Sequence, residues 1–207
     1  MTDLFERVHR FRQSDTWIFS YMLVSSLLSL IASLVLSIEA IHLAREPGAA
    51  LACDINEVIS CGKVGITWQA NLFGWPNAFL GLIAEPVVIT IAVASLGKVK
   101  FPRWFMLSAQ IVYTIGLAFA YWLFFQSMFV INALCPWCLL ITVSTTLVFT
   151  SLTHVNIRDN NLYLSERWHN RLQAGLRMGI DALVVTLWLL FLVMAVVLKY
   201  GPALWGA

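Results

Sequence analysis

The chain has 207 residues, of which 60% are hydrophobic and only 12% are charged, and its formal net charge at pH 7 is +2. Soluble domains carry roughly 25% charged residues, so this composition excludes an ordinary soluble protein and predicts an integral membrane protein. The small net charge gives no support to nucleic-acid binding.

Five segments are long and apolar enough to cross a bilayer, which requires about 20 mostly apolar residues per helix. In chain order they are residues 17–38, 76–96, two spans within 104–157 that turn at 131–136, and 182–198. The sequence therefore predicts an all-α integral membrane fold, a four-helix transmembrane bundle with a fifth transmembrane helix. We divide it into an amino-terminal segment 1–16, a four-helix core 17–157 with a loop at 43–75, and a carboxyl-terminal part 158–207.

The distribution of lysine and arginine predicts which side of the membrane each loop faces. Ten of the thirteen basic residues lie in three segments, 7–12, 98–103 and 158–177, which the five spans place on one side. Cytoplasmic loops carry the excess of basic residues, so we expect the amino terminus in the cytoplasm and the carboxyl terminus outside. The protein is then expected in the cell (plasma or inner) membrane, with loop 43–75 at the outer face.

All four cysteines fall on the outer side in this arrangement, where disulfides form and persist. Cys53 and Cys61 lie in loop 43–75, and Cys135 and Cys138 open the fourth span. Pro136 is favoured in the first turn of a helix, which places Cys135 near the N-cap, where unpaired N–H groups favour an anion such as a thiolate. We interpret this Cys-x-x-Cys as a reactive pair whose electron acceptor is a lipid-soluble molecule, most simply a quinone.

Two other interpretations fit four cysteines. They could bind zinc in a tetrahedral site, but the first pair is spaced C-x7-C and no histidine lies close in sequence, so we expect no metal. They could also form inert disulfides in a non-catalytic membrane protein or transporter with a stapled outer loop. Reduction of a quinone by the purified protein, given a reduced thiol substrate, would separate an enzyme from such a protein.

Three stretches resemble the vitamin K epoxide reductase family: CDINEVISCGKV at 53–64, LFGWPNAFLGL at 72–82 and LCPWC at 134–138. Their order is specific, with a C-x7-C loop pair, then an Asn at the head of the second span, then a Cys-x-x-Cys that opens the fourth. The resemblance covers roughly residues 17–155. The chain is similar to bacterial, particularly actinobacterial, members that re-oxidise a DsbA-like thioredoxin-fold protein, whereas DsbB-type quinone reductases carry the two cysteine pairs in the reverse order.

The resemblance implies a quinone-dependent, disulfide-forming oxidoreductase with a cysteine relay. Cys53 would exchange with the reduced external partner, Cys61 would resolve the mixed disulfide and attack Cys135, and Cys138 would pass electrons to menaquinone or ubiquinone. Thiol–disulfide exchange proceeds by thiolate attack through a mixed disulfide. A loop pair is therefore suited to carry electrons between a soluble protein and a pair fixed in the membrane, in support of disulfide bond formation.

The resemblance also suggests quinone-binding residues. Asn77 matches the family Asn that hydrogen-bonds a quinone carbonyl, and its amide can donate such a bond; a helix cap is the alternative. Thr67 matches a family Ser or Thr near the active site, with a hydroxyl bonded to its own backbone as the alternative. At Thr142 the sequence departs from vertebrate relatives, which place a Tyr four residues after the second Cys of the pair. This departure weakens any assignment of vitamin K epoxide as a substrate.

The remaining polar residues of the spans need their own interpretation. An ionisable group within a span is a functional-site hypothesis; Glu85 would relay protons to quinone or bond a backbone group freed by Pro86, and we expect the second. Glu39 and His42, at i,i+3 spacing, are expected to form an interfacial pair. Residues 165–179 are expected to form an interfacial helix on the cytoplasmic surface.

Overall fold

A computed structural model of the chain describes residues 13–46 and 48–204, and its architecture is the predicted all-α membrane fold. Five helices are long and apolar enough to cross a membrane. These are α2 (Asp15–Arg45), α4 (Ala78–Leu96), α5 (Arg103–Phe125) continued by the π-helix η2 (Gln126–Ile131), α6 (Pro136–Arg158) and α8 (Ile180–Leu204). Three shorter helices connect them, namely α3 (Cys61–Gly65), η1 (Trp68–Asn71) and α7 (Glu166–Met178). Most of the predicted segment 1–16 lies outside the described residues.

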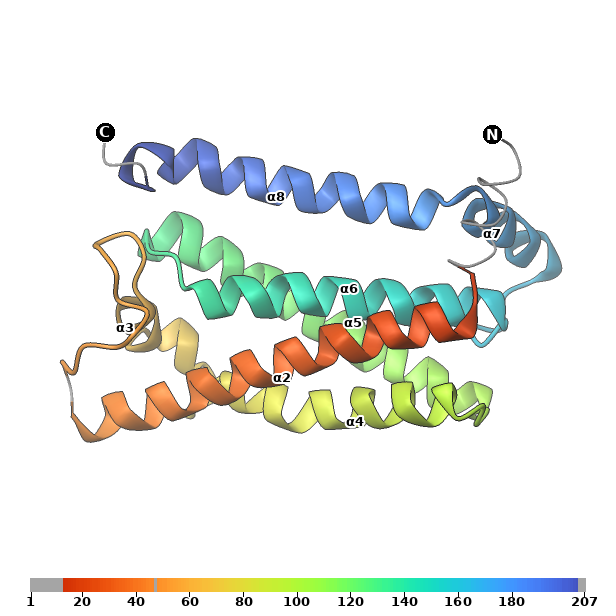
Figure 1. Ribbon diagram of the computed structural model, residues 1–207, viewed down its shortest axis with the longest axis horizontal. Coiled ribbons are helices and arrows are strands. Elements are labelled where there is room, and N and C mark those ends of the chain that lie inside the picture. The colour runs from red at the N-terminus through yellow and green to blue at the C-terminus, as the bar shows by residue number, and fades with distance from the viewer. Residues whose placement is uncertain (1–12, 47, 205–207) are drawn as a thin grey trace.

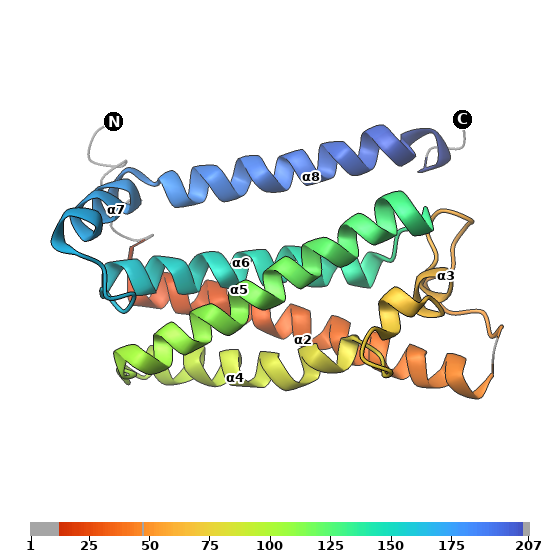
Figure 2. The ribbon, with the colours of Figure 1, turned by 180° about the vertical axis from the view of Figure 1, so that it is seen from behind.

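The four helices α2, α4, α5 and α6 form a bundle, and α8 lies along one flank of it beside α6 (Figure 1). Loop 43–75 with α3 lies at one end of the bundle, and α7 lies at the other end (Figure 2). The carboxyl-terminal end of α2, the start of α6 and α3 therefore meet at the same end. The fold collects at this end all segments that carry cysteines.

The first helix is longer than predicted. The sequence interpretation ended its span at residue 38, but α2 continues to Arg45. The added residues include Glu39, Ala40, Leu43 and Arg45, which are strong helix formers. The first charged residue, which we used to end the span, therefore did not mark the end of the helix. The extension places Glu39 on the part of α2 that leads into loop 43–75.

Small residues let α2 and α4 approach each other closely. The face of α2 toward α4 and α6 buries a row of serines: Ser25, Ser26, Ser29, Ser33 and Ser37. A Cβ atom added to Gly81 of α4 would collide with the Ser33 side chain. Close approach of backbones through small residues is a common way for helices to pack within a membrane.

Glu85 links three helices. Its carboxylate accepts hydrogen bonds from Ser29 Oγ of α2 at 2.7 Å and from the Tyr113 hydroxyl of α5 at 2.9 Å, and the residue is buried. Our expectation that Glu85 bonds a backbone group freed by Pro86 was therefore wrong. The carboxyl group links α4 to α2 and α5, because a hydroxyl group of each donates a hydrogen bond to it. These partners lie far from Glu85 in the sequence, so local patterns do not predict them.

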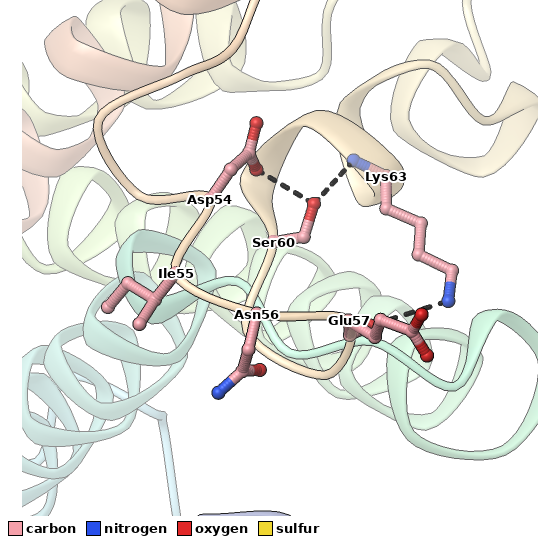
Figure 3. Close-up of a pocket in the computed structure, with 6 residues that line it drawn as sticks. All are labelled: Asp54, Ile55, Asn56, Glu57, Ser60 and Lys63. Carbon is pink, nitrogen blue, oxygen red and sulfur yellow. Dashed lines mark hydrogen bonds between the residues drawn. The ribbon is translucent and has the colours of Figure 1, made fainter.

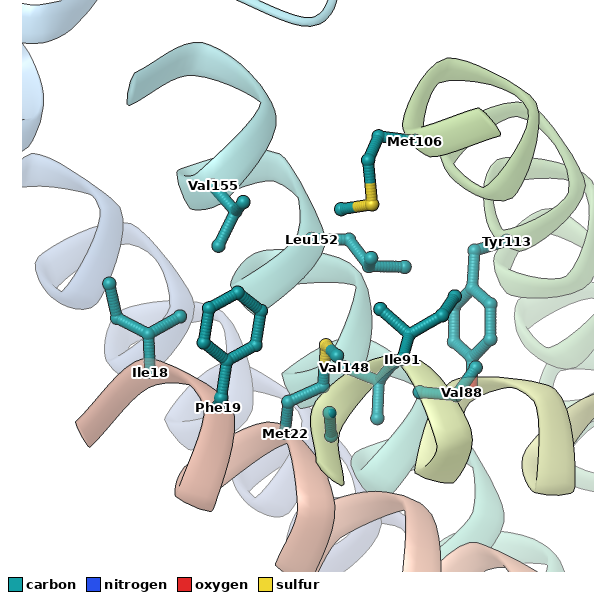
Figure 4. Packing of buried hydrophobic residues seen from close by; sticks show 11 residues of the cluster. Ile18, Phe19, Met22, Val88, Ile91, Met106, Tyr113, Val148, Leu152 and Val155 are labelled. Atoms are coloured by element: carbon teal, nitrogen blue, oxygen red, sulfur yellow. The ribbon is translucent and has the colours of Figure 1, made fainter. Parts of the chain in front are cut away.

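The main apolar core fills the half of the bundle remote from the cysteines (Figure 4). Side chains of α2, α4, α5 and α6 interdigitate there, and the most buried are Met22, Ile91, Ala92, Val148 and Leu152. Close packing of this kind makes the four-helix part rigid. The opposite end can then carry a functional site on a fixed frame.

Polar contacts attach α8 to the bundle. His154 Nδ1 of α6 lies 2.7 Å from Asp181 Oδ2 at the start of α8, and the Tyr200 hydroxyl near its end donates to the Met128 carbonyl oxygen at 2.9 Å. The amphipathic helix α7 precedes α8, as predicted. It ends at Met178 and is capped by Gly179, whose φ of 78° favours glycine. The side of the membrane on which α7 lies stays a prediction.

Candidate active site

Loop 43–75 contains a disulfide bond. Cys53 and Cys61 are joined, with their Cα atoms 5.7 Å apart. Ser60 is the N-cap of α3, its hydroxyl accepting from the Lys63 N–H, so Cys61 stands at the first position of this short helix. Both sulfur-bearing residues are buried, with exposed fractions of 7% for Cys53 and 2% for Cys61. Cys53 is therefore the more accessible of the two to an external thiol.

Asp54 fixes the shape of the loop around this disulfide. Its carboxylate accepts hydrogen bonds from the Leu51 N–H at 3.0 Å, the Ser60 hydroxyl at 2.7 Å and the Gly62 N–H at 2.9 Å. The Asp54–Ser60 bond is visible in Figure 3. Burial alone would raise the pKa of Asp54, but these hydrogen bonds outweigh it and lower the pKa below its ordinary value. Asp54 is thus held as an ion in a structural role.

We expect the loop to loosen at acid pH through Asp54. A carboxyl whose pKa is lowered by folding contributes stability above its unfolded pKa, about 4, and this stability is lost as the pH falls through the lowered folded value. Hydrogen exchange of the Gly62 amide should therefore accelerate in acid beyond the intrinsic rate. Asp54→Asn should remove this pH dependence and cost roughly tenfold in protection at neutral pH.

A matched control is available within the same loop. The Asn56 side chain accepts from the Val58 and Ile59 N–H groups, and it does not titrate. Asn56→Ala should therefore lower protection in the loop and keep the acid dependence. An unchanged acid dependence in Asp54→Asn would contradict the role given to Asp54.

The second cysteine pair opens α6, as predicted. Cys135 is the N-cap residue, Pro136 follows in the first turn, and Cys135 Sγ accepts a hydrogen bond from the Cys138 N–H at 3.2 Å. Both cysteines are free, Cys135 being buried and Cys138 partly buried. The Cys135 sulfur thus accepts one of the backbone N–H donors that are unpaired at a helix start.

Backbone hydrogen bonds join the two cysteine pairs. Ile59 and Leu134 form an isolated parallel β-bridge, in which the Ser60 N–H donates to the Leu134 carbonyl oxygen at 3.0 Å. In the reverse direction the Leu134 N–H donates to the Val58 carbonyl oxygen at 2.6 Å. The residues directly before Cys61 and Cys135 are therefore hydrogen-bonded to each other. All four cysteines belong to one apolar cluster, in which Cys53, Cys61 and Cys135 are buried and Cys138 packs against them.

Glu39 belongs to this site, which the sequence interpretation missed. Both of its carboxyl oxygens lie 3.5 Å from Cys53 Sγ. The predicted Glu39–His42 pair was wrong, because His42 Nε2 instead lies 3.9 Å from a carboxyl oxygen of Glu46, one turn further along. The available signal was an acidic residue on the apolar helix that leads into the cysteine loop.

The site also has a set of atoms that metals favour. The ligand atoms of Glu39, Cys53 and Cys61 lie within 4.8 Å of one another. Zinc is bound by thiolates, and both sulfurs here are joined in a disulfide, so this set does not form a zinc site in the oxidised loop.

Asn77 ties the start of α4 to the preceding turn. Its Nδ2 donates to the Gln69 carbonyl oxygen at 2.6 Å, and its Oδ1 accepts from the Leu72 N–H at 3.2 Å. Asn77 is the N-cap residue of α4, but its side chain makes no capping hydrogen bond, so the helix-cap alternative was wrong. An amide group has two N–H donors, and one of them is not used in these contacts.

Thr67 has a local backbone role. Its hydroxyl donates to the Val64 carbonyl oxygen at 2.7 Å, and its side chain caps η1 by accepting from the Ala70 N–H at 3.4 Å. This is the self-bonding arrangement that we weighed against a quinone contact. Contact between Thr67 and quinone stays a prediction.

Aromatic side chains cover this end of the bundle. Phe73 lies 5.6 Å from Trp75 and 5.9 Å from Phe119 of α5, and Trp68 lies 6.1 Å from Trp122, between ring centroids. Trp and Tyr concentrate where a membrane meets water. The cluster therefore agrees with an interfacial depth for the site.

The sequence matches one known protein family over most of its length. The model of the vitamin K epoxide reductase family matches residues 20–153, well over half of the chain. The chain belongs to the vitamin K epoxide reductase family. No curated protein matches it in sequence.

Members of the vitamin K epoxide reductase family are oxidoreductases that reduce quinones through cysteine pairs. The protein is therefore a multi-pass membrane enzyme of this kind, and the alternative of a non-catalytic, disulfide-stapled protein was wrong. The matched residues include both cysteine pairs and end before α7 and α8. The redox site thus lies wholly within the family core.

Proposed function

We propose that this protein re-oxidises an extracytoplasmic thioredoxin-fold protein of the DsbA type and passes the electrons to menaquinone or ubiquinone in the cell membrane. The enzyme would thereby support disulfide bond formation. The charge distribution supports an orientation with the amino terminus in the cytoplasm and the carboxyl terminus outside. The cysteines then face the outer compartment.

The β-bridge between Ile59 and Leu134 is the observation that carries this proposal. A relay needs the second cysteine of the loop pair to meet the first cysteine of the helix pair. Hydrogen bonds between the residues that precede Cys61 and Cys135 hold the two chain segments together at that point. A loop whose disulfide served only to stabilise the fold would not need to be hydrogen-bonded beside the second cysteine pair.

The relay proceeds through two exchanges. A partner thiolate attacks Cys53, and the Cys53–Cys61 bond breaks. The partner's second thiol, and not Cys61 as the family resemblance implied, resolves the mixed disulfide, because attack by Cys61 would release the partner still reduced. The loop pair is left as a dithiol. Cys61 then attacks Cys135 of an oxidised helix pair, Cys138 leaves with the electron pair, and Cys53 closes the loop disulfide again. Cys135 and Cys138 then give two electrons to quinone and return to the disulfide. The two protons that complete the quinol balance the two that the partner's thiols release.

An open hollow beside the disulfide supports a protein as the electron donor. It has a volume of about 540 Å³ and is lined by Asp54, Ile55, Asn56, Glu57, Ser60 and Lys63 (Figure 3). The Ile55 side chain on its rim is 70% exposed. We place the contact with a folded partner at this rim, because the rim is open and adjoins Cys53 and Cys61 in the chain.

The proposal is tested with purified protein in detergent or vesicles, supplied with a quinone and a reduced thioredoxin-fold protein. Quinone absorbance should fall as the partner becomes oxidised, with one disulfide formed per quinone reduced. The rate should greatly exceed that of the same mixture without the enzyme. Quinone reduction by a small dithiol, with no oxidation of any thioredoxin-fold protein, would remove the proposed partner class.

A further inference from the structure

Glu39 contacts the redox-active sulfur from a helix outside the cysteine loop. Both carboxyl oxygens lie 3.5 Å from Cys53 Sγ, and the carboxyl group also lies within 4.8 Å of Cys61 Sγ. Within the described part of the chain, Glu39 makes no other hydrogen bond or ion pair that the structure records. Because a disulfide sulfur carries no proton, any proton between these atoms belongs to the carboxyl group.

The two carboxyl groups of the site have different surroundings. Asp54 is occupied by backbone and hydroxyl donors and is held as an ion. Glu39 has no such donors and faces sulfur. Two carboxyl groups placed in contrasting environments commonly take different roles in catalysis, one electrostatic and one as acid or base.

Exchange at this site requires proton transfer at buried atoms. Cys61 and Cys135 are 2% and 1% exposed, so water has little access to the sulfur that leaves and later attacks. A buried thiolate without a partner is costly. Lys63, two residues after Cys61, donates to the Glu57 carbonyl oxygen at 3.4 Å.

We propose that Glu39 is the general acid and base of the loop cysteine pair, a role that rests on the proposed relay. When a partner thiolate attacks Cys53 and the S–S bond breaks, the electron pair stays on Cys61 and the Glu39 carboxyl proton moves to Cys61 Sγ. Glu39 is then a carboxylate. It takes the proton back from Cys61 as that sulfur attacks Cys135, so Glu39 is unchanged over the cycle.

Glu39→Gln keeps the size of the side chain and removes the exchangeable proton. General acid–base groups contribute about 10²–10⁴-fold, so we expect quinone reduction driven by a reduced thioredoxin-fold protein to slow by about a hundredfold at neutral pH. Glu39→Asp should recover part of the rate. Glu46→Gln is the matched control, since Glu46 ends the same helix but pairs with His42, and it should leave the rate unchanged.

The pH profile separates proton transfer from packing. The titratable groups near Glu39 are Asp54 of the loop, Cys138 of α6 and the two loop cysteines, with His42 on its own helix. With glutamine at position 39, deprotonation of Cys61 depends on hydroxide, so the rate should rise with pH and approach the parental rate in alkali. A loss that is constant across pH, or a Glu39→Gln rate equal to the parental rate, would overturn the proposal.

A second electron donor, dithiothreitol, distinguishes failure of the Glu39 role from failure of the relay. In a Cys53→Ala background, dithiothreitol should reduce the Cys135–Cys138 pair directly, without the loop disulfide that Glu39 is proposed to serve. There Glu39→Gln should have no effect on quinone reduction, and an equal loss in this background would overturn the assignment to the loop pair. Parental protein that reduces no quinone with either donor would overturn the relay itself, and the Glu39 role with it.

Discussion

Replacing Cys135 with alanine should reduce partner-driven quinone reduction to the uncatalysed background, and Cys61→Ala should do the same. Each change removes one sulfur of the exchange between the loop and α6, and no other described sulfur can replace it, because Cys53 and Cys138 are needed as the partners of the two disulfides. The β-bridge that holds Ser60 against Leu134 does not involve either side chain. Membrane insertion and the fold should therefore remain intact.

The measurement follows quinone absorbance together with alkylation of free thiols. In Cys135→Ala the partner should reduce Cys53 and Cys61, and this dithiol should accumulate because no electrons pass on to Cys138. Cys53→Ala serves as the control, since it should lose activity with a protein partner and keep activity with dithiothreitol. Near-normal partner oxidation in Cys61→Ala or Cys135→Ala would refute the relay. Equal loss of dithiothreitol-driven activity in Cys53→Ala and Cys138→Ala would refute the division of labour between the pairs.

Asn77→Ala should slow quinone reduction by roughly ten- to a thousandfold, the range expected for losing one donor to a developing negative charge. One N–H of the Asn77 amide donates to the Gln69 carbonyl oxygen, and this bond fixes the orientation of the amide. The second N–H remains for a quinone carbonyl. Exchange between the partner and Cys53 should be unaffected, because that step takes place in loop 43–75.

Asn71→Ala controls for loosening of the turn. Asn71 lies in the same segment, and its Nδ2 donates to the Gly65 carbonyl oxygen at 2.9 Å and the Thr67 carbonyl oxygen at 3.0 Å. If Asn77 acts on quinone, Asn77→Ala should reduce quinone at least tenfold more slowly than Asn71→Ala. The two variants should form the mixed disulfide at equal rates. Similar rates in the two variants would make Asn77 a tether of the turn alone.

The positions of the membrane spans and of Cys135 were predictable from the sequence because they depend on neighbours along the chain. Apolar length identifies a transmembrane helix, and all five predicted spans are present. A proline in the first turn defines a helix start, and Cys135 is the N-cap before Pro136. The order of the cysteine and asparagine motifs likewise identified the family that the comparison found.

The partners of the polar side chains were decided by tertiary structure. Glu39 was assigned to His42 by helical spacing, yet its contact is Cys53, on a loop that folds back over the helix end. Glu85 bonds Ser29 and Tyr113, which lie on two other helices. A side chain in a helix has several neighbours within one turn, and periodicity shows only the face on which it lies. Which residue meets that face depends on how the helices pack, and for Glu39 and Glu85 the packing selected partners that no local pattern encodes.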